Sequence, residues 1–257
     1  MVTIRCEDVS VTFQTAGGAV RALGGISLET GPSEFVAIAG PSGSGKTTLL
    51  RLIAGLVRPT SGWLELSGAL PGPGGCIRTV FQEHNLFPWL NTLDNATFGL
   101  RMAGVTAADA AARALPLFQR MGLAGRESAW PAELSTGTRQ RVAVIRAFLS
   151  DPSMLLMDEP FGAVDAQTRT TLQQELLELW TATRVPVVFV THDIDEAILL
   201  AQRVIVLEGS PGRVHSEHRI PFGYPRPFEL TMTPEFIDIK RGIHAGLGMR
   251  WEPAHAR

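Results

Sequence analysis

The sequence of 257 residues is poor in cysteine, and it contains no long apolar run. Its two cysteines, Cys6 and Cys76, are too few for a disulfide framework and fit a reducing compartment. The stretch MVTIRCEDVSVTF alternates like a strand and lacks the apolar core of a signal peptide. Apolar runs such as VPVVFV are far shorter than a membrane span. We therefore expect a soluble cytoplasmic domain.

A large excess of positive or negative charge is also lacking, because the net charge is only −2. No overall field favours nucleic acid or acidic lipid, and we expect no nucleic-acid partner. Lysine is scarce as well: only Lys46 and Lys240 occur beside 21 arginines. A GC-rich genome explains the general bias. Lys46 still stands out, because its ammonium group is a compact point charge, whereas the guanidinium group of arginine is larger and planar.

The chain alternates between strand-like and helical segments. Strand-like stretches lie at 3–13, 26–30, 34–40, 62–68 and 76–82, and MLLM, VPVVFV and RVIVLEG follow later. Helices are predicted at about 165–183, 193–202 and 233–247. This alternation indicates an α/β core with a parallel sheet. The Ala-rich segment 92–150 predicts a helical subdomain inserted into a domain of residues 1–210, and residues 211–257 predict a short appendage.

The segment GPSGSGKT at 40–47 matches the phosphate-binding pattern G-x-x-x-x-G-K-[ST] and lies between a buried strand and a helix. Its glycines allow backbone N–H groups to surround phosphate oxygens. Lys46 would reach the β- and γ-phosphates, and the Thr47 hydroxyl can bind Mg²⁺. We expect a nucleoside triphosphate to bind the loop formed by Gly40, Pro41, Ser42, Gly43, Ser44, Gly45, Lys46, Thr47 and Thr48.

Polar side chains follow three other apolar strands: Gln82 after CIRTVF, Asp158 and Glu159 at the end of MLLM, and His192 after VPVVFVT. Ligands of open parallel sheets bind at the carboxyl ends of the strands, so we expect these residues near the phosphates. Taken alone, Gln82 also fits a turn residue, and His192 fits a helix cap or a buried core histidine.

The chemistry of these groups predicts hydrolysis. Asp158 would hold Mg²⁺, together with Thr47 and Gln82, and Glu159 is the best general base for an attacking water. His192 would contact the γ-phosphate and position that water, so the predicted catalytic residues are Glu159, His192 and Lys46. A kinase would need an acceptor pocket, and the sequence identifies none.

Several motifs together resemble the ATP-binding subunits of ABC transporters. GPSGSGKTT, VFQEH, LSTGTRQRVAVIRA, MLLMDEPFGAVDAQTR and VTHDIDEA occur in the family's order and spacing, and the resemblance covers residues 2–210. It implies a P-loop NTPase core with a mixed or parallel sheet, an antiparallel N-terminal β portion, and ATP with Mg²⁺ as ligands. EHNLFPWLNTLDN and FGAVDAQTR look most like importers of nitrate, sulfonates and taurine, although pyrimidine-precursor importers look similar.

The segment LSTGTRQR occupies the place of the family's signature loop, usually LSGGQ. In the family, two chains pair head to tail, and the signature of one closes over the γ-phosphate held by the other. The resemblance assigns this role to Ser135, Thr136, Gly137 and Thr138. Thr136 and Thr138 replace the usual Gly and Gln, so we expect a working but slower site. Gly137 is retained where backbone approach to phosphate matters most.

Other roles follow from the resemblance position by position. Phe13 matches the aromatic that stacks on adenine, although a core-facing strand residue is an alternative. Asp165 matches the loop that crosses the dimer interface, and it also fits a helix N-cap. Phe87, Pro88 and Trp89 match the place where importers receive a helix of the membrane subunit, with simple core packing as the alternative.

The resemblance therefore implies the motor of a bacterial importer at the cytoplasmic face of the inner membrane. Its expected partners are a second copy of itself, permease subunits and a periplasmic solute-binding protein. Two other readings stay open. One is an exporter motor, and the other is a soluble ABC-type ATPase that uses ATP as a binding switch.

Overall fold

The computed structural model describes residues 2–68 and 77–246 and divides the chain into two compact units. One unit contains residues 69–185, and the other contains residues 2–68 and 186–257. Cys76 and the turn ALPGPGG lie outside the described residues.

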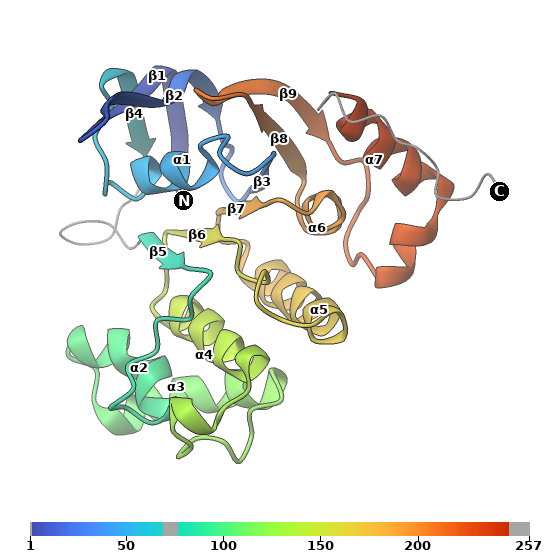
Figure 1. Ribbon diagram of the computed structural model, residues 1–257. Helices are drawn as coiled ribbons and strands as arrows, with labels where there is room; N and C mark the ends of the chain where they lie inside the picture. The colour runs from blue at the N-terminus through green and yellow to red at the C-terminus, as the bar shows by residue number, and fades with distance from the viewer. Residues whose placement is uncertain (1, 69–76, 247–257) are drawn as a thin grey trace. The chain divides into compact units, whose positions relative to one another are not determined.

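The second unit begins with an antiparallel sheet. It consists of β1 (Thr3–Thr15), β2 (Gly18–Glu29) and β4 (Ser61–Ser67) in the order β2-β1-β4 (Figure 1). Ile4, Cys6 and Val9 of β1 are buried. Burial raises the pKa of the free Cys6 thiol to about 12, so this thiol is unreactive. The predicted antiparallel N-terminal portion is confirmed.

The same unit contains a second sheet in the order β7-β3-β8-β9. Its strands are β3 (Phe35–Ala39), β7 (Val187–Thr191), β8 (Arg203–Glu208) and β9 (Arg213–Arg219). β3 is parallel to β7 and β8, whereas β9 runs antiparallel to β8. Every residue of β3 and β7 is buried, which explains their unbroken apolar sequences. α1 (Lys46–Ile53) and α6 (Ile194–Leu200) follow β3 and β7, and η2 (Phe228–Met232) and α7 (Pro234–Gly246) come last.

The first unit pairs β5 (Ile77–Val80) with β6 (Met154–Asp158) in parallel. Between them lie α2 (Thr92–Met102), α3 (Ala107–Arg120), η1 (Pro131–Glu133) and α4 (Thr136–Leu149), with α2, α3 and α4 grouped together in Figure 1. α5 (Ala166–Thr183) follows β6. Side chains of Asn91, Thr106, Ser135 and Asp165 cap the four longer helices. The predicted α/β class is confirmed.

No helix among the residues that the structure describes combines the length and the apolar character needed to cross a membrane.

Candidate functional site

The loop between β3 and α1 has backbone geometry that only glycine allows. Gly40 has a φ of 151°, and a Cβ there would lie 2.2 Å from the carbonyl oxygen of Leu207. Gly45, with a φ of 83°, precedes α1 as an N-cap without a side-chain hydrogen bond. The first N–H groups of α1 are therefore not taken by a capping side chain, which is the arrangement that binds anions.

Lys46 points back into this loop. Its Nζ donates to the carbonyl oxygens of Gly40 at 2.9 Å and Pro41 at 3.0 Å, and the residue is only 5% exposed. The buried Ser44 Oγ has no hydrogen-bond partner among the described residues. A buried ammonium group and an orphaned hydroxyl, beside a helix start without a side-chain cap, fit a triphosphate, whose oxygens accept hydrogen bonds.

The strand that precedes His192 ends beside the strand that precedes this loop. Ala39 and Thr191 are register partners in the parallel pair of β3 and β7, so Gly40 and His192 leave the same sheet edge. His192 itself is exposed, so the core-histidine alternative is wrong. The buried Thr191 hydroxyl donates to Glu196 at 2.6 Å and accepts from the Asp193 N–H at 3.0 Å, which fixes the turn around His192.

The predicted site residues Gln82, Asp158 and Glu159 lie in the first unit. Asp158 is the last residue of β6, and Glu159 follows with a left-handed φ of 45°. Such a backbone is uncommon outside glycine and is often found at functional sites. The Gln82 Nε2 lies 3.3 Å from where a Cβ of Gly162 would stand, so Gln82 lies against the turn after Glu159.

The signature segment forms the start of α4. Ser135 is the N-cap, and its Oγ accepts from the Thr138 N–H at 3.2 Å and lies 2.8 Å from the Thr138 hydroxyl. Gly137 is buried, and a Cβ there would lie 2.4 Å from the Thr168 methyl group. Packing within the chain is therefore a reason for glycine at this position that the sequence did not reveal.

Asp165 and the signature segment are neighbours. Asp165 caps α5 by accepting from the Thr168 N–H at 3.0 Å, which confirms the N-cap interpretation. Hydrogen bonds from the Thr168 side chain and backbone lower the pKa of this exposed carboxyl. Because Thr168 also packs on Gly137, the starts of α4 and α5 lie side by side.

The aromatic residues that the sequence singled out are largely exposed. Phe13 on β1 is 38% exposed and pairs in register with the exposed Val20, so the core alternative is wrong. Trp89 is 68% exposed, and core packing is wrong for this residue too. Phe87 is half-buried between Trp89 and Phe98, with ring centroids at 5.4 and 4.5 Å, and Pro88 between Phe87 and Trp89 is exposed.

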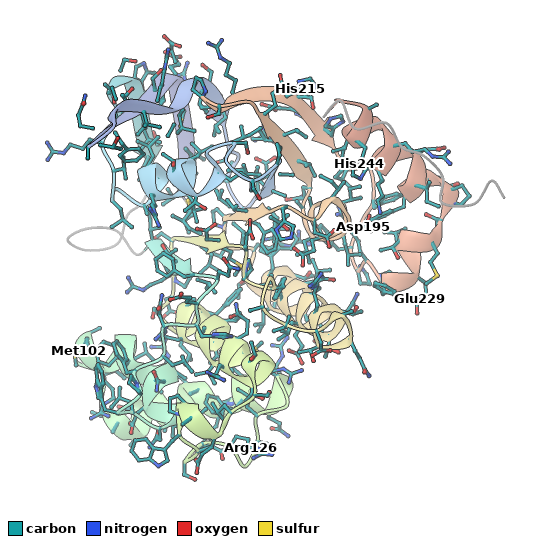
Figure 2. All side chains as sticks on the ribbon, in the orientation of Figure 1. Met102, Arg126, Asp195, His215, Glu229 and His244 are labelled. Carbon is teal, nitrogen blue, oxygen red and sulfur yellow. The ribbon has the colours of Figure 1, made fainter. Side chains whose placement is uncertain are left out.

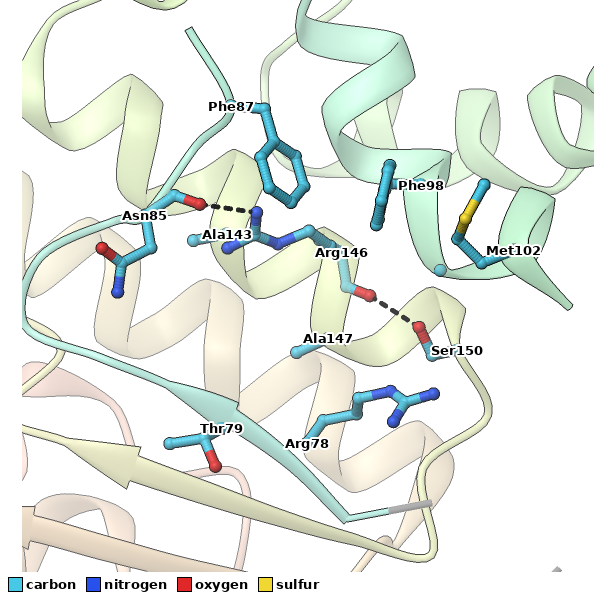
Figure 3. A pocket seen from close by; sticks show the side chains of 11 residues that line it. Arg78, Thr79, Asn85, Phe87, Phe98, Met102, Ala143, Arg146, Ala147 and Ser150 are labelled. Atoms are coloured by element: carbon cyan, nitrogen blue, oxygen red, sulfur yellow. Dashed lines mark hydrogen bonds between the residues drawn. The ribbon is translucent and has the colours of Figure 1, made fainter. Parts of the chain in front are cut away.

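Phe87 lines a cavity of about 460 Å³ in the first unit (Figure 3). Arg146 of α4 donates to the carbonyl oxygens of Asn85 at 2.8 Å and His84 at 3.0 Å, and its guanidinium lies over the Phe87 ring. Burial lowers the pKa of the His84 imidazole, which also hydrogen-bonds to the backbone of Thr136. The cavity is lined by Arg78, Thr79, Asn85, Phe87, Phe98, Gly99, Met102, Ala143, Arg146, Ala147 and Ser150.

Sequence reasoning missed Arg78 and Arg146. In a chain with 21 arginines, no local signal separates these two from the rest.

The chain matches known proteins along most of its length. The family model described as ABC transporter matches residues 23–162. The taurine import ATP-binding protein TauB of Jannaschia sp. (strain CCS1) is 40% identical, over 98% of this chain and 95% of that protein. TauB of Pseudomonas syringae pv. tomato is 46% identical, over 87% and 85%. An uncharacterized ABC transporter ATP-binding protein of Methanocaldococcus jannaschii, MJ0412, is 43% identical, over 94% and 90%.

Solved structures agree. A dimeric post-hydrolysis structure of the ATP-binding cassette MJ0796, bound to ADP and Pi, has a TM-score of 0.75 and 31% identity, covering 86% of this chain and 100% of that chain. A second dimeric structure of MJ0796, described as a bacterial ABC transporter cassette, has a TM-score of 0.74 and 32% identity. Family, relatives and fold all confirm the resemblance found in the sequence. This chain belongs to the ABC transporter family, as an ATP-binding and ATP-hydrolysing subunit.

Proposed function

We propose that this chain is the motor subunit of a bacterial importer for a small sulfonate-like or nitrate-like solute. It works at the cytoplasmic face of the inner membrane with permease subunits and a solute-binding protein. The names of the taurine-import relatives support the solute class, since these proteins are 40% and 46% identical. The observation that carries the motor role is the loop around Lys46, whose buried ammonium group and open helix start suit the phosphates of ATP.

In this proposal, residues 1–210 form the ATPase domain, with 92–150 as its helical insertion. Residues 211–257 follow it as an appendage whose first part, β9, adds an edge strand to the second sheet. Residues 40–48 hold the phosphates, and Phe13 stacks on adenine. Thr47, Gln82 and Asp158 would hold Mg²⁺, whose charge offsets that of the phosphate oxygens. The hydroxyl, amide and carboxylate oxygens of these residues are the hard ligands that this ion prefers.

Hydrolysis proceeds with Glu159 as the general base. Its carboxylate accepts a proton from water while the water oxygen bonds to the γ-phosphorus, and the bond from that phosphorus to the ADP oxygen breaks. His192 donates to a γ-phosphate oxygen and orients the water. Lys46 balances the charge on the β- and γ-oxygens, so the products are ADP and inorganic phosphate.

Two copies pair head to tail, each signature segment (Ser135, Thr136, Gly137 and Thr138) facing the ATP of the other. The exposed Ser135 and the adjacent Asp165 turn support this arrangement, because a continuous surface from two helix starts is available to a partner. Phe87, Pro88 and Trp89 with the cavity beside them form the permease contact. The exposed Trp89 supports that assignment.

The test of the motor role is ATP turnover by Glu159→Gln. We expect at least a 10²-fold loss of turnover with ATP affinity retained, because the base is removed and the phosphate loop is intact. Glu178→Gln, which changes an exposed glutamate of α5, is the matched control and should hydrolyse as the wild type does. Turnover of Glu159→Gln within about threefold of the wild type would show that Glu159 is not the base.

The transport role is tested with the chain reconstituted in vesicles with its permease and solute-binding protein. Uptake of taurine or nitrate that needs ATP is the expected result. ATP-driven efflux from the same vesicles would contradict import.

A further inference from the structure

The short helix α6 starts two residues after His192, and the C-terminal segment, residues 221–246, is bonded to both of its ends. A helix of seven residues is not stable by itself, so its position depends on such outside contacts. All of these contacts lie in the second unit.

At the carboxyl end of α6, two side chains satisfy four consecutive carbonyl groups. Arg226 donates to Ile198 at 2.7 Å, Leu199 at 3.3 Å and Ala201 at 2.7 Å, and the Tyr224 hydroxyl donates to Leu200 at 2.7 Å. These carbonyls are the ones that a helix end leaves without partners. Arg226 is only 1% exposed, and its positive charge lies where the helix dipole favours it.

At the amino end of α6, Lys240 of α7 bonds to the Asp195 carboxylate, with Nζ and Oδ2 2.7 Å apart. Figure 2 labels Asp195 on α6 next to the C-terminal segment. The neighbouring Asp193 accepts from the N–H groups of Asp195 at 2.9 Å and Glu196 at 3.4 Å, and so caps the helix. His192 lies directly before this cap.

The C-terminal segment has a separate apolar attachment. Phe236 and Ile243 of α7 are fully buried, and the Phe222 and Phe236 rings stack with centroids 6.2 Å apart. Loss of the partly exposed ion pair of Lys240 therefore leaves α7 attached. The polar bonds to α6 and the apolar attachment can be tested separately.

We propose that the C-terminal segment is a clamp on α6, with Arg226 and Lys240 as positioning residues that hold His192 in its orientation towards the γ-phosphate. This rests on the proposed role of His192 in hydrolysis. Because small displacements of a group that orients a reactant reduce the rate strongly, the clamp acts on kcat and not on ATP affinity.

The test compares Lys240→Ala with Arg241→Ala. Arg241 follows Lys240 on α7, and its side chain, which is 56% exposed, bonds to Asp238 of its own helix at 3.5 Å. We expect Lys240→Ala to lower kcat about three- to tenfold with an unchanged KM for ATP and an unchanged melting temperature. Arg241→Ala should behave as the wild type, and Lys240→Arg should recover most of kcat.

Two further measurements separate positioning from a structural role. Amide exchange of residues 191–201 should be faster in Lys240→Ala than in Arg241→Ala, and faster still in Arg226→Lys. In a His192→Ala background, Lys240→Ala should have no additional effect on kcat, because the clamp acts through His192.

Unchanged kcat in Lys240→Ala, or an equal loss in the His192→Ala background, would overturn the clamp even if amide exchange changes. If His192→Ala is impaired while Lys240→Ala hydrolyses ATP as the wild type does, only the clamp fails. If His192→Ala hydrolyses ATP at the wild-type rate, the proposed role of His192 fails first, and the clamp fails with it.

Discussion

The starts of α1 and α4 are both proposed to face ATP, yet they are built differently. α1 follows Gly45, a left-handed residue that offers no side-chain cap, whereas α4 is capped by its own Ser135. The first arrangement leaves backbone N–H groups to the phosphates. The second uses the Thr138 N–H within the chain, so α4 has a finished helix start before any partner arrives.

The glycines of the two segments also differ in what a side chain at each position would meet. A side chain at Gly40 would meet the backbone of Leu207, which cannot move away, whereas one at Gly137 would meet only the Thr168 methyl group. The loop before α1 is therefore constrained by backbone at Gly40 and also at Gly45, where a Cβ would lie 2.8 Å from the Ala22 carbonyl oxygen. The start of α4 is a packed surface whose shape depends on a neighbouring side chain.

Removing the ammonium group at α1 should have the largest effect on nucleotide binding. Lys46→Ala is expected to lower ATP affinity about 10²-fold, since charge-assisted bonds contribute roughly 1.5–3 kcal/mol each and about 1.4 kcal/mol is tenfold. Titration calorimetry at fixed salt measures it. Arg58→Ala removes an exposed cation of the same unit and should bind ATP normally. Equal affinity of Lys46→Ala and Arg58→Ala would contradict the assignment.

A charge at the start of α4 should instead prevent pairing and leave ATP binding intact. Ser135→Asp keeps the N-cap, because Asp and Ser cap equally well, and adds a carboxylate that repels the phosphate of a partner. In the Glu159→Gln chain, which should dimerise with ATP, we expect a monomer by sedimentation and ATP affinity within about twofold. Ser135→Asn caps without the charge and should still dimerise.

Gly137→Asp is a poorer choice for this experiment, because its Cβ collides with Thr168 of the same chain. A tenfold loss of ATP affinity in monomeric Ser135→Asp would mean that the segment serves its own ATP.

Thermal melts can separate the two kinds of glycine. Gly137→Ala should cost about 1–3 kcal/mol by overpacking, which lowers the melting temperature by roughly 2–12 °C. Adding Thr168→Ser removes the obstructing methyl group, and the double variant should melt close to Thr168→Ser alone. Gly40→Ala meets a backbone carbonyl and a φ of 151°, so no partner substitution should restore it. If the double variant melts well below Thr168→Ser alone, the loss of stability comes from the helix start itself and not from the contact with Thr168.

Much of the fold could be predicted because buried parallel strands have unbroken apolar sequences, as VPVVFV at β7 does. Two strands are exceptions: the sequence does not predict β9, and it predicts β2 only from residue 26 although this strand begins at Gly18. Residues 18–22 are exposed or half-buried and include two alanines, so no apolar alternation marks them as a strand. Their pairing with β1 decides their conformation.

The loop around Lys46 could be predicted because its chemistry is local in sequence. Arg146, His84 and Arg226 could not, because each acts on backbone carbonyls or N–H groups that lie far away in the chain. Backbone groups leave no trace in a sequence. The roles of Gln82, Asp158, Glu159 and the signature segment stay predictions for the experiments above.

The smallest effect on stability is expected at Trp89, beside the cavity that the carboxyl-terminal half of α4 lines. Trp89→Ala should change the free energy of unfolding by less than about 0.5 kcal/mol, because the residue is 68% exposed. Phe87→Ala is the matched comparison. It loses contacts to Phe98 and Arg146 and should lower the melting temperature measurably.

The two substitutions also distinguish a permease contact beside this cavity from a role in stability. If Trp89 contacts the permease, Trp89→Ala keeps the ATPase activity of the isolated chain and lowers ATP-driven uptake in reconstituted vesicles. A large drop in melting temperature for Trp89→Ala would mean that the ring supports the fold and not a partner. If uptake and the melting temperature of Trp89→Ala are both unchanged, Trp89 does not contact the permease. The docking surface would then be limited to Phe87 and the cavity that α4 lines.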